Sequence, residues 1–351
     1  MARRVGSARV PMGRAEQVVF KERQANRDEY LPLVHIQPQV RDSLAPLPGR
    51  FAFRCTGERT TFTAVPTMNS LSQYCNLLGI PIQFVEKIPA NMAIRMFSVL
   101  LDTCEKADGR QFLVRLNERD GTRLRAILAH SFVRFDDRQV LRVLNQVSGG
   151  GFQMKNIEVD EDQMHLRLLL PTAISDPLEL GTTLKKDRAF AGIDFVTSET
   201  GARPMEMRYL LFREICSNGL TALSHEQKVL KRRYAEIDRA VFEQIVREAI
   251  SRASTHGRET AERLAASRAE AIPDPGREVD SVFRGFRLGS SHGRIGRWVR
   301  EEVEQSAGLF GVQRFDLIQA FTAVARGLES RDRLRVEDAM GEYLVRGMGR
   351  N

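Results

Sequence analysis

Alternating hydrophobic and polar positions dominate the first two thirds of the chain. Four pairs of such segments are separated by short turns: 50–55 with 60–65, 111–116 with 122–132, 152–159 with 163–170, and 188–198 with 204–216. A period of two is the spacing of a β-strand with one buried face. Asp120-Gly121, in the turn of the second pair, is a strong hairpin signal. We therefore predict four antiparallel hairpins.

Between these hairpins the apolar positions recur at helical spacing. Helices are predicted behind Asn69 or Ser70, over residues 91–105, and over 136–147, where Asp136 or Asp137 caps the start and three glycines follow the end. Strands and helices do not alternate regularly. The fold class is therefore α+β, an antiparallel hairpin sheet with interspersed helices.

Beyond Gly219 the pattern becomes helical throughout. The segment 228–253 carries Ile237, Val241, Ile245 and Ala249 at four-residue spacing, which predicts one long core-facing helix. The run Pro-Asp-Pro-Gly at 273–276 interrupts the chain, and helical spacing then resumes. A C-terminal helical layer is thus predicted to follow the sheet.

These patterns divide the chain into three regions. Residues 1–48 are predicted to be a basic flexible arm and linker, because arginines there stand among small residues without a period. Residues 49–224 form the α+β hairpin domain. Residues 225–351 form the helical region, with a Pro/Gly break near 273–276.

The composition indicates a globular protein of the cytoplasm. The chain has 351 residues, of which 42% are hydrophobic, and no apolar run is long enough for a membrane span or a secretory signal. Its 4 cysteines are scattered, as expected of reduced thiols. The 6 histidines form no zinc-binding pair, so we expect no metal or other cofactor.

A formal charge of +8 favours a polyanionic partner, and basic residues gather in particular places. On the hairpin 111–132, Arg115, Arg123 and Arg125 share one face, with Arg134 near its end. Like charges side by side repel, so a phosphate backbone laid across them would stabilise this face. The alternative is a solvated face with acidic neighbours. If these side chains are exposed, Arg123→Glu with Arg125→Glu would abolish DNA binding and leave stability within about 1 kcal/mol.

Two further segments are basic. Lys228, Lys231, Arg232 and Arg233 are predicted to begin the long helix. Residues 281–300 interleave Arg294 and Arg297 with aromatic residues, among them Trp298. Arginines beside aromatic rings are typical of proteins that bind single strands, since rings stack on bases and guanidinium groups contact phosphates. The alternative is an ordinary loop whose Phe283 and Phe286 pack in the core.

Arg213 interrupts an apolar row in the fourth hairpin. It follows Met205, Met207, Tyr209 and Leu211 on one face of the predicted strand. A buried unpaired guanidinium is too costly to keep. Arg213 is therefore predicted to pair with Glu199 or Asp194, to lie at the sheet margin or beside a bulge, or to bind phosphate.

Residues 123–234 resemble the phage/plasmid-like prophage protein family, domain of unknown function 932. The resemblance includes the run RAILAHSFVRFDDRQVL, with Phe132 and Asp137 where the family has tyrosine and asparagine. It continues in a Ser-Glu-x-Gly turn and an Arg-x-x-Cys-x-Asn-Gly run, which comprise Ser198, Glu199, Gly201, Arg213, Cys216, Asn218 and Gly219. The resemblance implies an origin in a mobile element and no established activity.

The function expected from these features is binding and annealing of single-stranded DNA in phage or plasmid recombination or replication. The bound strand is placed in a basic groove between the hairpin sheet and the helical layer. Without a G-x-x-x-x-G-K-[ST] motif, ATP use is not expected, and by analogy with annealing proteins of the Red-beta group we expect a homo-oligomer. One alternative is a metal-dependent nuclease using Asp194, Glu199, Glu206 and Glu214. Another is a non-enzymatic regulator or host-defence antagonist.

Overall fold

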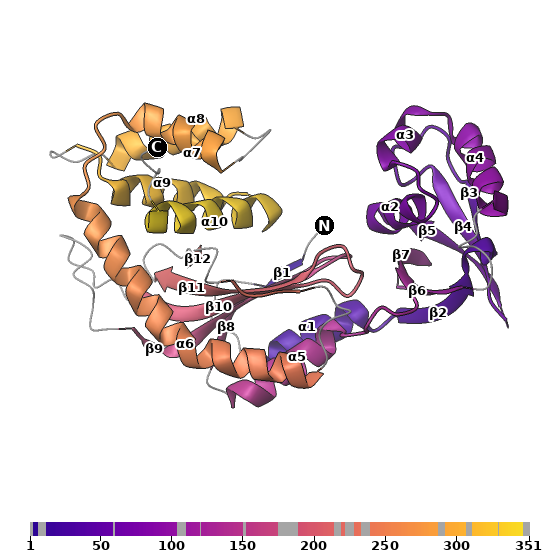
Figure 1. Cartoon of the computed structure of the whole chain (residues 1–351), viewed down its shortest axis with the longest axis horizontal. Coiled ribbons are helices and arrows are strands. Elements are labelled where there is room, and N and C mark those ends of the chain that lie inside the picture. The colour runs from indigo at the N-terminus through magenta and orange to yellow at the C-terminus, as the bar shows by residue number, and fades with distance from the viewer. Residues whose placement is uncertain are drawn as a thin grey trace.

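The computed structural model shows two lobes, each built on its own sheet (Figure 1). It describes residues 3–5, 12–58, 60–103, 110–119, 121–149, 152–174, 189–213, 219–221, 228–232, 239–286, 292–306, 311–328 and 330–346. The protein is of the α+β class, as the sequence predicts, with an antiparallel sheet, a mixed sheet and a C-terminal helical region.

The first lobe is a six-stranded sheet covered by three helices. Its strand order is β2 (Asn26–Pro32), β6 (Gln111–Asn117), β7 (Arg123–Ala129), β5 (Thr61–Pro66), β4 (Phe51–Thr56) and β3 (Ile36–Val40), after the short 3-10 helix Leu33–His35. Only β5 and β7 pair in parallel among the described strands of this sheet.

Helices α2 (Met68–Leu77), α3 (Ile82–Lys87) and α4 (Ala90–Thr103) bury the apolar side of this lobe. Thr67 caps α2 through a reciprocal pair of bonds with Ser70. Tyr74 packs edge-to-face on Phe53 and Phe97, with ring centroids 4.8 and 5.5 Å away. The buried Cys75 lies in the same core, and burial raises the pKa of its thiol to about 12.

The second lobe is built on a seven-stranded antiparallel sheet. Its order is β1 (Arg3–Val5), β8 (Gln153–Val159), β9 (Met164–Ala173), β10 (Ala189–Thr197), β11 (Met205–Arg213) and β12 (Gly219–Thr221), and β13 (Lys228–Arg232) also pairs with β11. Helices α1 (Met12–Arg23), α5 (Asp137–Ser148) and α6 (Arg239–Ala266) cover one face (Figure 1). Side chains such as Ile193, Phe195 and Phe242 fill the core between them.

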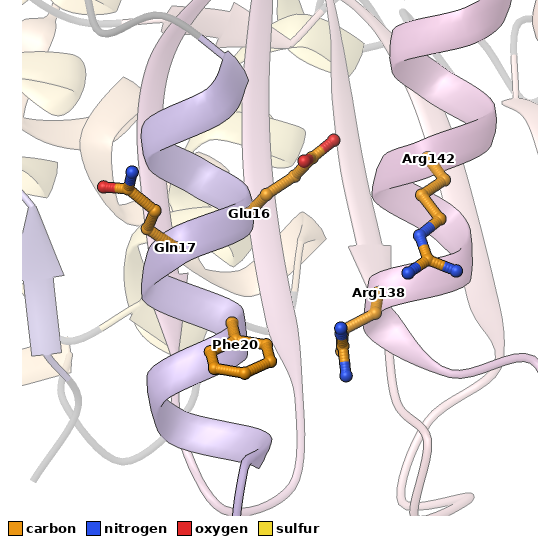
Figure 2. Close-up of a pocket in the computed structure, with 5 residues that line it drawn as sticks. All are labelled: Glu16, Gln17, Phe20, Arg138 and Arg142. Atoms are coloured by element: carbon orange, nitrogen blue, oxygen red, sulfur yellow. The ribbon is translucent and has the colours of Figure 1, made fainter.

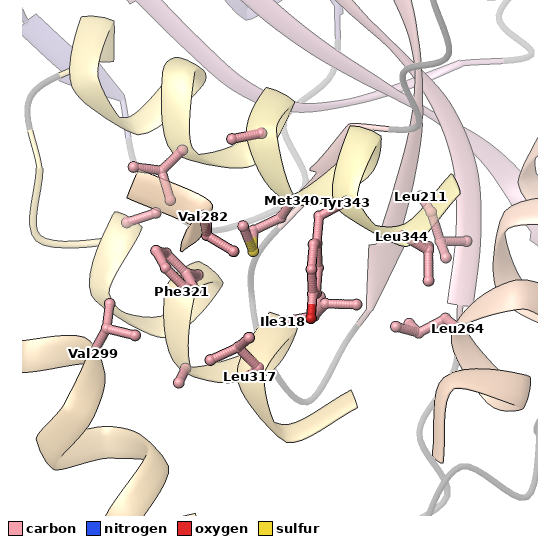
Figure 3. Close-up of a cluster of buried hydrophobic side chains, with 14 of the residues drawn as sticks. Leu211, Leu264, Val282, Val299, Leu317, Ile318, Phe321, Met340, Tyr343 and Leu344 are labelled. Carbon is pink, nitrogen blue, oxygen red and sulfur yellow. The ribbon is translucent and has the colours of Figure 1, made fainter. Parts of the chain in front are cut away.

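The opposite face of this sheet carries the C-terminal helices. Helix α10 (Ser330–Arg346) lies nearest the sheet, with α9 (Arg314–Ala325), α8 (His292–Ser306) and α7 (Pro275–Gly285) stacked beyond it (Figure 1). Figure 3 shows the apolar core of this layer, in which Phe321 and Met340 belong to the helices and Leu211 to β11. The break at 273–276 follows the 3-10 helix Ser267–Ala269 and includes the first residues of α7, which Asp274 caps.

Local patterns predicted most elements. All four hairpins are present, as β4–β5, β6–β7, β8–β9 and β10–β11. Helix α5 has Asp136 as its cap and ends at Gly149, whose φ of 53° is left-handed.

The expected division of the chain requires three corrections. The described part of the predicted flexible arm is ordered: 12–23 is a helix packed on α5, and β2 and β3 belong to the first sheet. The region 49–224 contributes to both lobes and is no single domain. Residues 228–232 form a strand, and the long helix begins at Arg239.

The buried stripe of α6 agrees with the prediction only in part. Ala249 is buried as predicted, but Phe242 and Val246 are buried in place of Val241 and Ile245, which are half-buried. Ile237 lies outside the described residues. Among the helices that the structure describes, none combines the length and apolar character needed to cross a bilayer.

Candidate nucleic-acid interface

The basic face predicted on the β6–β7 hairpin is largely buried. A β-bulge shifts the register between Arg115 and Leu116, so that Arg125 becomes an extra residue beside the Arg115–Ala126 pair. Arg115 and Arg125 are only 3% and 1% exposed. The expectation of an exposed phosphate-binding face is therefore wrong for these two residues, because carboxylates from elsewhere in the chain neutralise them.

Glu199, at the end of the β10–β11 hairpin, is the centre of this buried cluster. Its carboxylate lies 2.5 Å from Arg125 and 3.0 Å from Arg23, and its carbonyl oxygen accepts a bond from Arg115 at 2.8 Å. Arg23 also pairs with Asp137 at 3.0 Å. We call these five residues the Glu199 cluster.

The two carboxyl groups of the Glu199 cluster have opposite pKa shifts. Burial acts to raise the pKa of Glu199, but Arg23, Arg125 and Arg115 together hold it well below its usual range. Burial and the neighbouring Glu199 charge raise the pKa of Asp137 to about 7, although Arg23 opposes the rise. Each carboxyl group of the cluster thus contacts an arginine, and Arg115 also pairs with Asp28 and Asp136 outside it.

Ser198, Glu199 and Gly201 of the family-like motifs lie at this hairpin end, near Phe132 and Asp137. Ser198 donates a bond to the carbonyl of Asp162 at 2.5 Å. Gly201 has a φ of 69°, and a Cβ there would lie 2.9 Å from Leu128 and 3.5 Å from Phe132. A glycine is required at this turn for both reasons. Of the remaining motif residues, Gly219 begins β12, whereas Cys216 and Asn218 lie outside the described residues.

A second charged cluster lies between the seven-stranded sheet and α10. Asp194 of β10 contacts His165 at 2.6 Å and Arg167 at 3.1 Å, and Arg167 also pairs with Glu337 of α10. Further pairs join Arg208 to Glu206 and Asp338, and Arg333 to Glu158. We call these nine residues the α10 cluster.

The predicted position of a bound strand, in a groove between the sheet and the helical layer, is wrong because the α10 cluster fills that space. The space between the hairpin sheet and the helical layer is occupied by α10 and by buried ion pairs, so the described residues leave no basic groove there. The nuclease carboxylates are also dispersed: Asp194 and Glu206 pair with arginines under α10, Glu199 lies in its own cluster, and Glu214 is outside the described residues. Within the described ranges no three His, Cys, Asp or Glu side chains are placed to hold a metal ion.

An exposed row of arginines lies instead around the start of α5. Arg134, Arg138 and Arg142 are all exposed, and we call them the α5 arginine row. The guanidinium of Arg138 lies 4.6 Å from the ring centroid of Phe20 on α1, and that of Arg134 lies 6.0 Å from the ring of Tyr30 on β2. These rings are themselves 44% and 39% exposed.

Two cavities adjoin this row, and Arg138 lines both. The first, of about 350 Å³, lies between α1 and α5 (Figure 2) and is lined by Glu16, Gln17, Phe20, Arg138 and Arg142. The second, of about 320 Å³, is polar and is lined by Arg23, Asn26, Asp28, Arg115, Arg134, Asp136, Arg138 and Glu199. Arg134 donates to Asp28 at 2.8 Å at its rim.

The other predicted site residues do not join this surface. Arg123 pairs with Glu161 at 3.0 Å. Arg297 and Trp298 are exposed on α8, on the opposite side of the sheet from α1 and α5 (Figure 1). Phe283 is buried and Phe286 half-buried, which confirms their interpretation as core residues.

Several predicted positions fall where the structure describes no side chain. Arg213, Lys228, Lys231 and Arg232 lie in described strands and Arg294 in α8, but their side chains are outside the described part, as is all of Arg233. The predicted partners of Arg213 are engaged elsewhere: Glu199 with Arg23 and Arg125, and Asp194 with His165 and Arg167.

Sequence reasoning missed Phe20, Arg138 and Arg142. The four-residue spacing of the two arginines on a predicted helix places them on one face, and this signal was available. The position of Phe20 could not be predicted in this way, because residues 1–48 were interpreted as a flexible arm and linker.

Comparisons with protein-family models, with curated proteins and with solved structures found no match. The resemblance of residues 123–234 to the phage/plasmid-like family stays a prediction from motifs.

Proposed function

We propose that this protein binds single-stranded DNA across the α5 arginine row. The observation that carries the proposal is a repeated pairing of an exposed arginine with an exposed aromatic ring: Arg138 with Phe20, and Arg134 with Tyr30. Each pair offers a ring on which an unstacked base can lie. The guanidinium of Arg138 contacts no described carboxylate and is open to the adjoining phosphate, whereas that of Arg134 also pairs with Asp28. Duplex DNA keeps its bases stacked, so the rings favour a single strand.

The charges of this surface support the same proposal. Elsewhere in the described residues arginines such as Arg23, Arg167 and Arg333 are buried against carboxylates. Arg138 and Arg142 have no carboxylate partner within the described part of the chain. Exposed cations of this kind gain binding free energy when a phosphate displaces their counterions.

The specific form of the proposal is strand annealing in phage or plasmid recombination or replication. A protein that presents bases on rings and holds phosphates by arginine can bring two complementary strands together without ATP. A homo-oligomer would extend the short surface of one chain along a longer strand.

The test is fluorescence anisotropy of a labelled dT30 oligonucleotide across a salt series. Arg138→Glu with Arg142→Glu should weaken binding at least tenfold and reduce the dependence on salt. The matched control is Arg258→Glu with Arg263→Glu, an equal charge change on exposed positions of α6. Equal losses in both variants would assign the binding to net charge, and absent or salt-independent binding would overturn the proposal.

A further inference from the structure

The cavity between α1 and α5 has polar groups that no other described part of the chain satisfies. Figure 2 shows Glu16 projecting from α1 toward α5, while Arg138 and Arg142 project from α5 toward the same space and Phe20 lies level with Arg138. Neither Glu16 nor Arg142 forms an ion pair with any residue in the described ranges. In the Glu199 and α10 clusters, by contrast, acids and arginines contact one another directly.

The size of the cavity suits one nucleotide. Its volume of about 350 Å³ is at the lower end of the range of small-molecule sites, which runs from roughly 300 to 1,000 Å³. The exposed ring of Phe20 forms one wall, and the guanidinium of Arg138 already lies over that ring. A flat heterocycle can take the same stacked position.

The hydrogen-bonding capacity of the Glu16 carboxylate determines which base this cavity would favour. An ionised carboxylate accepts hydrogen bonds through two oxygens and donates none. Guanine is the base whose pairing edge presents two adjacent donors, N1–H and the N2 amino group. Adenine and cytosine present one amino donor beside an acceptor, and thymine presents one N–H between two carbonyls, so each places an acceptor against the carboxylate.

We infer that this cavity is a subsite for one guanine nucleotide of the bound strand. Glu16 accepts from N1–H and the N2 amino group, Phe20 stacks on the base, and Arg142 binds its phosphate. Arg138, which lines both cavities, contacts the strand where it passes to the second cavity. The inference rests on the proposed function and adds a base preference to it.

Competition binding tests the inference. Unlabelled dT20, and dT20 with one central dG, dA or dC, compete against labelled dT20 at a fixed salt concentration. The dG oligonucleotide should compete about tenfold better than dT20, as expected for one bidentate contact. In Glu16→Gln the two oligonucleotides should compete equally well. The control Glu22→Gln removes an equal charge from α1, from a residue that pairs with Arg119 at 3.0 Å, and should preserve the ratio.

The outcomes separate the two proposals. If dT20 binds and dG gives no advantage, or if Glu16→Gln keeps the advantage, the guanine subsite is overturned and the proposed function stands. If no oligonucleotide binds, the proposed function fails. Equilibrium dialysis with radiolabelled dGMP and dTMP then decides on the subsite alone: Glu16-dependent retention of dGMP supports it, and equal or absent retention overturns it.

Discussion

At the scale of single residues, the described arginines differ in burial and in their partners. Arg23, Arg115, Arg125, Arg167 and Arg208 are buried, and each contacts at least one carboxylate. A buried charge is tolerated only when it is paired and hydrogen-bonded, so these pairs are requirements of the fold. The α5 arginine row is exposed; Arg134 pairs with Asp28 at 2.8 Å, whereas Arg138 and Arg142 contact no carboxylate in the described part of the chain. Some of the positive charge in the sequence is therefore required by the fold, and some is exposed at the surface.

Asp137 gives this protein a pH-dependent stability. Its carboxyl group keeps its proton up to about pH 7 in the folded chain, because burial and Glu199 raise its pKa, whereas an unfolded aspartate loses the proton near pH 4. As pH rises from 5 to 8, the unfolded state binds fewer protons than the folded state, so the free energy of unfolding falls. Asparagine cannot ionise. The unfolding free energy of the wild type should therefore fall relative to that of Asp137→Asn over this range.

Urea denaturation at pH 5, 6, 7 and 8 measures this difference. Each unit of pKa difference corresponds to about 1.4 kcal/mol. Asp102→Asn, at an exposed position of α4, is the control. A difference between wild type and Asp137→Asn that stays constant with pH would contradict the account.

At the scale of elements, the close packing of α6 on the sheet depends on Gly257. A Cβ at this position would lie 2.6 Å from Cβ of Ala191 on β10 and 2.8 Å from Cδ1 of Ile174. Both neighbours belong to a buried core, so neither has room to move away. The helix can approach β10 this closely because this residue has no side chain.

Gly257→Ala should consequently destabilise the protein. Alanine in a helix interior normally improves stability over glycine by about 1 kcal/mol, but overpacking of a filled core costs about 1 to 3 kcal/mol and should outweigh it. Thermal and urea unfolding measure whether the substitution lowers or raises the free energy of unfolding. Gly276→Ala in α7 is the comparison, since its Cβ would make an ordinary 3.6 Å contact with Asp274, and its stability should be unchanged or slightly raised. A gain for Gly257→Ala would show that α6 shifts to accommodate the methyl group.

At the scale of the whole molecule, the end of the β10–β11 hairpin joins the two lobes. The carbonyl of Thr200 accepts bonds from Gln73 at 2.8 Å and Asn69 at 3.3 Å, both on α2 of the first lobe. Glu199 adds its contact with Arg125 on β7. Each lobe also has its own apolar core, so the hairpin end is a principal connection between two separately packed bodies.

Glu199→Ala should uncouple the unfolding of the two lobes. The substitution leaves Arg23 and Arg125 buried with fewer acidic partners, which costs about 3 to 5 kcal/mol and weakens the contact between the lobes. The chain has 1 tryptophan, Trp298, in the second lobe. Its fluorescence should therefore give a urea midpoint that differs from the midpoint of far-UV circular dichroism, while the wild type gives coincident midpoints.

The matched control for Glu199→Ala is Glu161→Ala. Glu161 pairs with Arg123 at the surface, and such pairs contribute little to stability. The control should retain coincident midpoints. Coincidence in Glu199→Ala as well would show that other contacts suffice to couple the lobes.

The sequence determined the local elements because their signals are local. Alternation of period two and an Asp-Gly turn predicted β6 and β7, and Asp136 with Gly149 predicted both ends of α5. The same signals failed at 228–232, where a basic amphipathic run is compatible with a strand or a helix and pairing with β11 decided for the strand. For the site, the sequence correctly placed Arg115 and Arg125 near each other. The predicted nucleic-acid-binding residues also included Arg134, which belongs to the α5 arginine row.

Only the tertiary structure determined which arginines remain exposed and able to contact a ligand. Arg125 contacts Glu199, which is 74 residues away in the sequence, and Arg23 contacts Asp137, which is 114 residues away. A local sequence pattern does not predict contacts between residues so far apart in the chain. Those pairings remove two arginines from the surface, whereas the docking of α1 against α5 brings Phe20 to Arg138 and Glu16 into the same cavity. The physical reason is that burial and charge neutralisation depend on which segments fold together, while strand and helix patterns depend on neighbours along the chain.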